Sequence, residues 1–232
     1  MKILLIAGHG AGDPGAVATI KGKKYREADE TRALVSYIVP ALKEYGVDVT
    51  VYDTGRNAYS DYKSGALASI AQFSKYDYVL EIHFNAFKYD KGDGEKKGVE
   101  CYVTTSEKGV LVEETICKNI ASIGFTNRGV KRNNWAVITK AKASGPSSAL
   151  LEVCFIDDAD DMAVYTKSRQ KIAKAVADGI AVGYGLKKKE SEIDIAKKTI
   201  KAKAGLSDST IDYLAAYKYG SDLLKKLAAA MK

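Results

Sequence analysis

Apolar and polar residues alternate along the first 186 positions as short strands separated by helices. Mostly apolar runs, typical of buried strands, lie at residues 3–7, 47–52, 78–83, 99–103 and 149–155. Helical spacing of apolar residues lies between them, at residues 27–45, 59–75, 109–123 and 169–184. Strands that alternate with helices of this length predict an α/β domain, with a largely parallel sheet covered by helices on both faces.

Two segments interrupt this pattern. Residues 8–24 are rich in glycine, and residues 87–98 are mostly polar. Loops of this length inside a compact domain are usually functional or mobile, and we expect the same of these two.

The composition becomes strongly polar at residues 185–190, which places a domain boundary after Leu186. Residues 187–232, referred to here as the tail, form a predicted all-helical appendage. Its predicted helices lie at residues 192–204, 209–217 and 222–231. Ser207 or Asp208 is suited to cap the second of these helices, and Ser221 the third. A segment of this size without disulfides is marginal as an independent fold, so we expect it to pack on the body or on a second copy of itself.

Positive charge is concentrated in the tail. The chain carries a net charge of +7, and the tail contributes eleven lysines and six acidic residues, a net charge of +5. A basic segment on a nearly neutral body indicates an anionic partner, such as a wall polymer, a nucleic acid or lipid headgroups.

Signals for membranes and secretion are weak. No apolar run approaches the roughly 18 residues that a membrane span needs, so we expect no membrane insertion. The apolar run at residues 3–7 is too short for a signal peptide, which predicts synthesis and retention in the cytoplasm. The three cysteines, Cys101, Cys117 and Cys154, form no CxxC pair, and we expect buried thiols rather than disulfides.

The chain has two histidines, and both lie at the ends of predicted strands. His9 follows the strand at 3–7, and His83 ends the strand at 78–83. Open α/β sheets bind ligands outside these strand ends. Two imidazoles and one carboxylate leave an open fourth position, which is the arrangement of a catalytic zinc site. The candidate carboxylates are Asp13, Glu27, Glu30, Glu81 and Glu152.

The positions of the two histidines also fit two other roles. They can be hydrogen-bonded residues at loop junctions, or a general base and its partner. The second interpretation lacks a nucleophile, because no G-x-S-x-G motif occurs and Cys154 lies in an apolar run. Glu27 is the first residue of a predicted helix. A negative charge there is stabilised by the helix dipole, so Glu27 does not need a ligand to explain its position.

Glu152 is a single carboxylate inside the apolar run 149–155. Burying such a group is costly unless it has a task or a partner. It is therefore either a general base, with a pKa raised by its apolar neighbours, or a salt-bridged structural acid.

Five motifs connect these residues. They are AGHGAGDPGA at 7–16, IHFNAF at 82–87, GVECY at 98–102, NRGV at 127–130 and LEVCFI at 151–156. In order and spacing they resemble the zinc-dependent N-acetylmuramoyl-L-alanine amidases, particularly the phage and prophage endolysins of Gram-positive bacteria. The resemblance covers roughly residues 1–184.

The resemblance implies a single α/β domain with a mixed sheet, and zinc held by His9, Glu27 and His83. It implies hydrolysis of the amide between N-acetylmuramic acid and L-alanine in peptidoglycan, through water activated by the zinc. Glu152 would take the proton of the water and deliver it to the leaving nitrogen. Glu81, two residues before His83, competes with Glu27 as a ligand.

The resemblance also implies roles outside the metal site. Asn85 and Arg128 are expected to orient the substrate or neighbouring groups. An endolysin without a signal peptide would reach the wall after release by a holin. Its tail would bind anionic wall polymers or hold a homodimer together. The tyrosines Tyr213, Tyr217 and Tyr219 can stack on sugars or fill a small helical core.

The sequence has features of two other classes of protein. A ligand-binding protein on the same fold would perform no chemistry and would have no use for Glu152. A nucleic-acid module is suggested by residues 204–208, which lie between two predicted helices and are faintly similar to a helix-turn-helix. Asp208 and Asp212 would then face the phosphates, so we expect no nucleic-acid partner.

Overall fold

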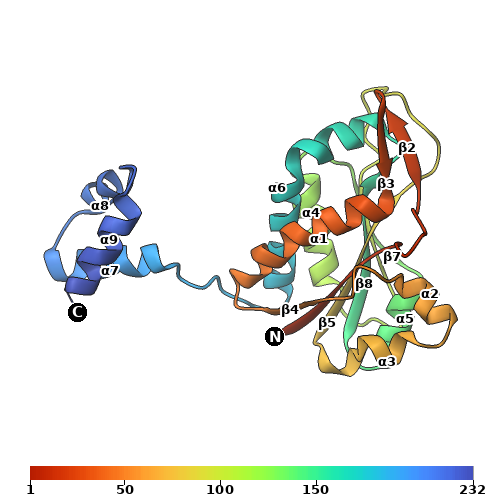
Figure 1. Ribbon diagram of the computed structural model, residues 1–232, viewed down its shortest axis with the longest axis horizontal. Coiled ribbons are helices and arrows are strands. Elements are labelled where there is room, and N and C mark those ends of the chain that lie inside the picture. Colours follow the sequence, from red (N-terminus) through yellow and green to blue (C-terminus); the bar gives the residue numbers. More distant parts are fainter. Residues whose placement is uncertain (232) are drawn as a thin grey trace. The chain divides into compact units, whose positions relative to one another are not determined.

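The chain divides into two compact units in the computed structural model, which describes residues 1–231. The first unit is Met1–Lys187 and the second begins at Lys188, whereas the sequence places the boundary one residue earlier. Figure 1 labels the helices and strands of both units, and each unit has a hydrophobic core of its own. Among the described residues, no helix combines the length and the apolar character that crossing a membrane requires.

A six-stranded sheet forms the centre of the first unit. Its strands are β1 (Lys2–Ala7), β4 (Asp48–Val51), β5 (Tyr78–Asn85), β6 (Val99–Val103), β7 (Asn127–Arg132) and β8 (Ser147–Phe155). They lie in the order β4-β1-β5-β8-β6-β7, and all neighbouring pairs are parallel except β8 with β6. The predicted α/β class with a mixed, largely parallel sheet is confirmed.

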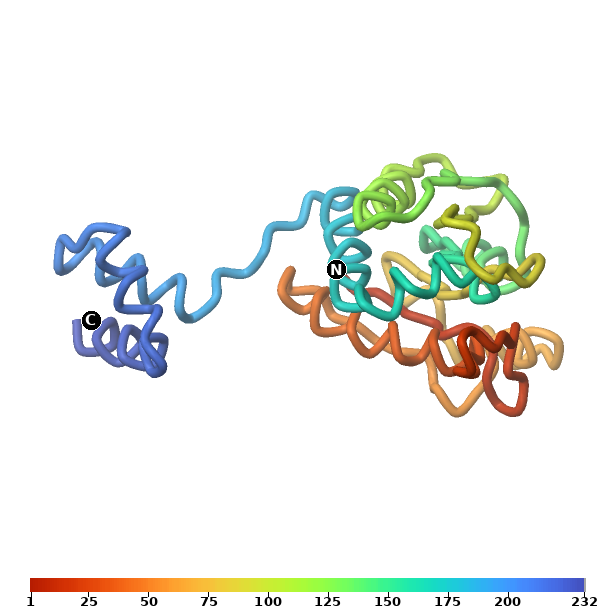
Figure 2. The backbone as a smooth tube through the Cα atoms, turned by 90° about the horizontal axis from the view of Figure 1, so that it is seen from above, coloured from red at the N-terminus to blue at the C-terminus, as the bar shows by residue number. Residues whose placement is uncertain are grey.

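Helices cover both faces of this sheet. One face carries α1 (Glu27–Lys43), α4 (Leu111–Ala121) and α6 (Ala159–Gly183), and Figure 2 shows α6 between the other two. The opposite face carries α2 (Ala58–Lys63), α3 (Leu67–Ala71), the 3-10 turn η1 (Phe73–Lys75) and α5 (Ala136–Ala143). Side chains alternate along β1, so Ile3 and Leu5 join the first core while Leu4 and Ile6 join the second.

Left-handed backbone explains two errors of prediction. The single helix predicted at residues 59–75 is wrong, because Gly65 (φ 81°) and Gln72 (φ 49°) end α2 and α3. The loop predicted at residues 8–24 contains an antiparallel hairpin of β2 (Val17–Ile20) and β3 (Lys23–Arg26). The two turn residues between these strands both have positive φ, as a two-residue hairpin turn requires.

Other elements differ from the sequence pattern for local reasons. The helix α6 begins at Ala159 rather than at residue 169, because the Asp158 side chain accepts the backbone N–H groups of Asp160 and Asp161 and caps it. The pattern predicts neither β7, a polar strand at the sheet edge, nor the short α5. All three cysteines are free and buried.

The second unit consists of α7 (Glu192–Ala204), α8 (Asp208–Ala215) and α9 (Gly220–Ala230). Its small core consists of Ala196, Ile200, Ile211, Leu224 and Ala228. Ser207, one of the two residues predicted as candidates, caps α8. The predicted cap Ser221 is wrong, because α9 begins at Gly220, two residues before the predicted start. It follows Tyr219, whose side chain makes no capping bond.

Candidate metal centre

His9 lies just beyond β1, with a left-handed backbone at φ 61°. Its Nδ1 is 2.8 Å from the Asp13 carboxylate, and Asp13 also accepts hydrogen bonds from the Asn57 amide and the Gly15 backbone. Asp13 thereby orients the ring so that Nε2 points to Glu27 Oε2, at 3.1 Å. Asp13 is one of the candidate carboxylates, and the structure places it behind the histidine rather than among the prospective ligands.

Glu27 is the first residue of α1 and is 3% exposed. Its oxygens accept the backbone N–H groups of Ala16 and Phe84, and Oε1 is 2.9 Å from His83 Nδ1. Burial raises the pKa of Glu27, but hydrogen bonds with His83 and His9 outweigh it and hold the pKa well below the usual range. Glu27 is therefore an ionised carboxylate between the two imidazoles.

His83 lies near the carboxyl end of β5 and completes the cluster. One ligand atom from each of His9, Glu27 and His83 falls within 4.8 Å of the others. The Glu27 oxygens lie 3.1 Å from His9 Nε2 and 2.9 Å from His83 Nδ1, so the three side chains are close enough together to share one metal ion. Glu81 faces the other ring nitrogen of His83, at 3.2 Å, and lies outside this set. Glu81 is therefore placed to orient His83, whereas Glu27 is placed to share a metal with it.

The electrostatics of the cluster favour a cation. Burial alone would lower the pKa of His83, yet hydrogen bonds to Glu27 and Glu81 and the charge of Glu152 raise it well above its ordinary value. The pKa of His9 is likewise raised against burial by Glu27 and Asp13. These carboxylates create a negative potential at the two imidazoles. Together with the donor set of two nitrogens and one oxygen, this potential fits a divalent zinc ion.

Two glycines of the first motif leave room for the cluster. A Cβ at Gly8 would lie 2.3 Å from the His83 ring, and one at Gly15 would lie 2.7 Å from Glu27 Oε2. Gly15 also has φ 63°, which favours glycine. The glycines beside His9 are thus explained by the close approach of the three side chains.

Glu152 lies on β8 directly opposite His83 on β5. Burial raises the pKa of Glu152 to about 7, against the opposing effect of the His83 charge. Its Oε2 is buried without a hydrogen-bond partner, and none of the ion pairs found within residues 1–231 involves it. A salt-bridged structural role is therefore excluded within this part of the chain. The geometry leaves an isolated carboxyl group beside the cluster, suited to exchange protons near neutral pH.

Asn85 and Arg128 do not contact the cluster; both contact Glu100, a residue that sequence reasoning missed. Glu100 Oε1 accepts from the Asn85 amide at 2.8 Å, and Oε2 accepts from Arg128 Nε at 2.6 Å. Glu100 is 1% exposed and pairs with Glu152 across β6 and β8. The signal that identifies Glu152, a single acid in an apolar strand, is also present at residues 99–103 and could have identified Glu100.

Two cavities flank the cluster at this edge of the sheet. One has a volume of about 300 Å³ and is lined by both histidines together with Tyr59 and Trp135. The other has a volume of about 500 Å³ and is lined by Asn85, Glu100 and Arg128 among others. The two histidines thus face an aromatic cavity, and Glu152 pairs with Glu100, which lines the polar one.

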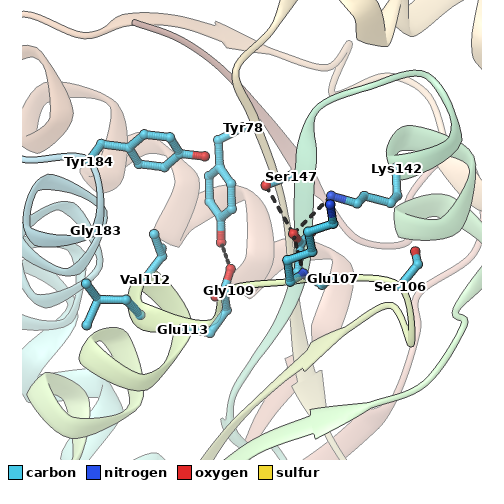
Figure 3. A pocket seen from close by; sticks show the side chains of 12 residues that line it. Tyr78, Ser106, Glu107, Gly109, Val112, Glu113, Lys142, Ser147, Gly183 and Tyr184 are labelled. Atoms are coloured by element: carbon cyan, nitrogen blue, oxygen red, sulfur yellow. Dashed lines mark hydrogen bonds and ion pairs between the residues drawn. The ribbon is translucent and has the colours of Figure 1, made fainter.

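A further cavity, of about 460 Å³, lies at the opposite edge, where β5 and β8 begin. Here Glu107 accepts hydrogen bonds from Lys142 and Ser147, and Tyr78 donates to Glu113 (Figure 3). Its acids have protein partners, and none of the sequence-predicted site residues lines it. The chemistry therefore concentrates at the carboxyl ends of β1, β5 and β8.

Residues 3–182 match the family described as N-acetylmuramoyl-L-alanine amidase. The chain belongs to this amidase family. The resemblance predicted from the five motifs is thereby confirmed at the level of the family.

Relatives and solved structures agree with this membership. The probable autolysin PH of Staphylococcus aureus is 27% identical over 195 residues, which are 77% of this amidase-family chain and 38% of that relative. The chain therefore spans well under half of the length of that relative. The catalytic domain of CwlV, an N-acetylmuramoyl-L-alanine amidase from Bacillus (Paenibacillus) polymyxa, superimposes with a TM-score of 0.63 at 24% identity, covering 80% of this chain and 99% of that one.

The catalytic domain of the CD27L endolysin, which targets Clostridia difficile, superimposes with a TM-score of 0.62 at 23% identity. The likeness covers 78% of this chain and 97% of that domain. At these identities the likenesses establish a shared fold, and the chemistry is argued from the site.

Proposed function

We propose that the chain hydrolyses the amide bond between N-acetylmuramic acid and L-alanine in bacterial peptidoglycan. Membership of the amidase family over residues 3–182 supports the reaction class. The observation that carries the proposal is the convergence of His9, Glu27 and His83 within 4.8 Å, beside the unpaired carboxyl group of Glu152. A protein that only binds a ligand needs neither feature.

His9, Glu27 and His83 would hold the zinc ion. Zinc, when bound there, polarises the substrate carbonyl and lowers the pKa of water. Asp13 and Glu81 hold the two imidazoles in orientation through their second nitrogens, as residues behind metal ligands commonly do. Glu27 stays ionised, which keeps it available as a ligand.

Glu152 would move the proton in this reaction. It accepts a proton from the attacking water as the new carbon–oxygen bond forms, and it returns that proton to the alanine nitrogen as the carbon–nitrogen bond breaks. Its burial and its lack of an ion pair within the described residues leave the carboxyl group able to take up and release a proton. We propose that Asn85 and Arg128 orient the substrate from the adjoining polar cavity, where both are held by Glu100.

Mass spectrometry of digested peptidoglycan tests this proposal. We expect new fragments that begin with a free L-alanine amino group, together with glycan strands that retain intact muramic acid. Zinc chelation should abolish their release, and zinc should restore it. Cleavage within the glycan, within the peptide, or nowhere would contradict the proposal.

We also propose that the second unit attaches the enzyme to the wall, in the manner of an endolysin that reaches the wall after release by a holin. Tyr213, Tyr217 and Tyr219 are 64%, 56% and 68% exposed, so they do not fill the helical core. Exposed tyrosines beside lysines suit an anionic sugar polymer, because the ring packs on apolar sugar faces and the ammonium groups pair with the charge. Dimerisation through this unit is the competing proposal.

Truncation after Lys187 separates these roles. The remaining unit should stay folded and hydrolyse soluble muropeptides at close to the full rate, since it contains the whole cluster. Binding to intact cells and lysis should weaken, and the binding of the full chain should decline with added salt. Light scattering identifies a dimer by a mass that falls to less than half on truncation. A truncated chain that binds and lyses cells as well as the full chain would contradict both proposals for the tail.

A further inference from the structure

A basic pocket lies beside the proposed catalytic carboxyl group. It is the polar cavity of about 500 Å³ already described, and Lys97, Arg128 and Lys131 line it together with the single acid Glu100. Two of these cations lie close to the Phe155 ring: the Arg128 guanidinium is 5.0 Å and the Lys97 ammonium 5.9 Å from its centre. The aromatic wall helps to fix these cations in position.

The charges in this basic pocket do not cancel. Glu100 is its only acid, and one of its oxygens accepts from both Arg128 and Lys131. Lys97 has its own partners outside the pocket, Asp158 at 3.3 Å and Asp90 at 3.7 Å. One carboxylate therefore faces two cations, which leaves about one positive charge available to a ligand.

The terminal N–H groups of the Arg128 guanidinium are available to a ligand. Its Nε is bound to Glu100, whereas the only hydrogen bond found for the terminal nitrogens, within residues 1–231, is a long one of 3.5 Å to the Lys97 carbonyl. A guanidinium presents its terminal N–H groups in a plane that matches a carboxylate. The pocket is therefore suited to an anionic ligand of this shape.

Strand geometry places the pocket within reach of the bond to be cut. Arg128 reaches from β7 back to Glu100 on β6, and Glu100 pairs directly with Glu152 on β8. Neighbouring strands are about 4.8 Å apart, and a peptide advances about 3.5 Å per residue. A carboxylate one or two residues beyond the cleaved amide would thus meet Arg128 while the amide lies at Glu152.

The cavity on the other side of the cluster has a different character. Tyr59 and Trp135 line it, and no lysine or arginine does. A sugar ring packs its apolar face on aromatic side chains, whereas the stem peptide carries free carboxylates. The two cavities therefore assign a direction to the substrate, with the glycan toward Trp135 and the peptide toward Arg128.

We propose that the basic pocket of Lys97, Arg128 and Lys131 is the stem-peptide subsite, and that it selects peptides whose second residue carries a free α-carboxylate over those carrying a carboxamide. This inference rests on the proposed amidase function and adds a substrate preference to it. Arg128 and Lys131 are specificity-determining residues in this assignment, and Glu100 is the positioning residue that aligns them.

Two synthetic substrates test the assignment. They are N-acetylmuramoyl peptides that are identical except for isoglutamate or isoglutamine at the second position. With the zinc-loaded full chain, we expect kcat/KM to be about tenfold or more higher for the carboxylate, because a hydrogen bond to a charged partner contributes that much. The difference should lie mainly in KM, since the contact is distant from the proton transfer.

Arg128→Gln and Lys131→Met should each bring the ratio of the two kcat/KM values toward one. The matched control is Lys108→Gln, which removes an exposed lysine at the opposite edge of the sheet and should leave the ratio unchanged. Thermal melting checks that each variant is folded. Lys131→Met keeps the ion pair of Arg128 with Glu100, so it reports on the pocket even if Arg128→Gln unfolds.

The outcomes are distinguishable. Wild-type cleavage of both peptides with equal kcat/KM, or a ratio that both pocket variants leave unchanged, overturns the subsite while the amidase function stands. A preference for the carboxamide overturns it as well. If the wild type releases an alanine amino terminus from neither peptide, the proposed function fails and the subsite fails with it.

Discussion

His83→Ala should abolish zinc binding and, with it, hydrolysis of peptidoglycan. The variant retains His9 and Glu27, but a site with two protein ligands lacks the third donor of the proposed set. We expect the loss in zinc affinity to exceed the roughly 10- to 100-fold that removing a residue behind the ligands costs. Zinc content after dialysis, measured by mass spectrometry, and a competition assay with a chelating dye provide the two measurements.

Glu81→Gln is the matched control for this variant. Glu81 is buried beside the same imidazole but contacts the other ring nitrogen, so its loss should weaken zinc binding without abolishing it. Zinc affinity should be highest in the wild type, lower in Glu81→Gln and lowest in His83→Ala. Stoichiometric zinc in a folded double variant, His9→Ala with His83→Ala, would contradict the ligand assignment.

The sequence predicts those parts of the fold that local pattern controls. The buried strands at 3–7, 78–83 and 149–155 are apolar on both faces because helices cover both faces, and their position is confirmed. The edge strand β7 has the sequence Asn-Arg-Gly-Val-Lys-Arg and is stabilised by pairing with β6, which a local pattern does not show. Similarly, the apolar spacing at 59–75 continues through Gly65 and Gln72, where the backbone ends the helices.

In the candidate site, too, the sequence predicts some features and leaves others to the tertiary structure. Parallel strands bring His9 and His83 to one edge, so their proximity follows from the order of the elements. The residues that orient these histidines cannot be predicted in the same way. Asp13, Asn57 and Glu81 are identified only once the directions of the side chains are known. Arg128 is the clearest case. Its direct partner, Glu100, lies 28 positions earlier in the chain, and the structure brings the two together through β6 and β7.

Glu152→Gln should retain zinc and the fold but lower kcat by about 10² to 10⁴, the usual contribution of a general acid–base residue. The amide has nearly the shape of the carboxyl group but cannot accept the proton of the attacking water. Because Glu152 forms no ion pair within the described residues, its replacement breaks none. Glu100→Gln is the contrasting variant: it removes the carboxylate that Arg128 and Lys131 share, and should lower stability instead.

The stability of the zinc-free protein gives an independent check on Glu152. Burial raises its pKa from 4.5 to about 7 in the folded state, so the folded protein binds this proton more tightly than the unfolded chain does. The stability that this proton contributes is fully present below about pH 4.5 and is lost as the pH rises through 7. Glu152→Gln removes that dependence, so chemical denaturation at pH 8 should find the variant at least as stable as the wild type. Below pH 5 this advantage should shrink. A variant that is markedly less stable at pH 8, yet keeps its specific activity, would show that Glu152 supports the fold rather than the chemistry.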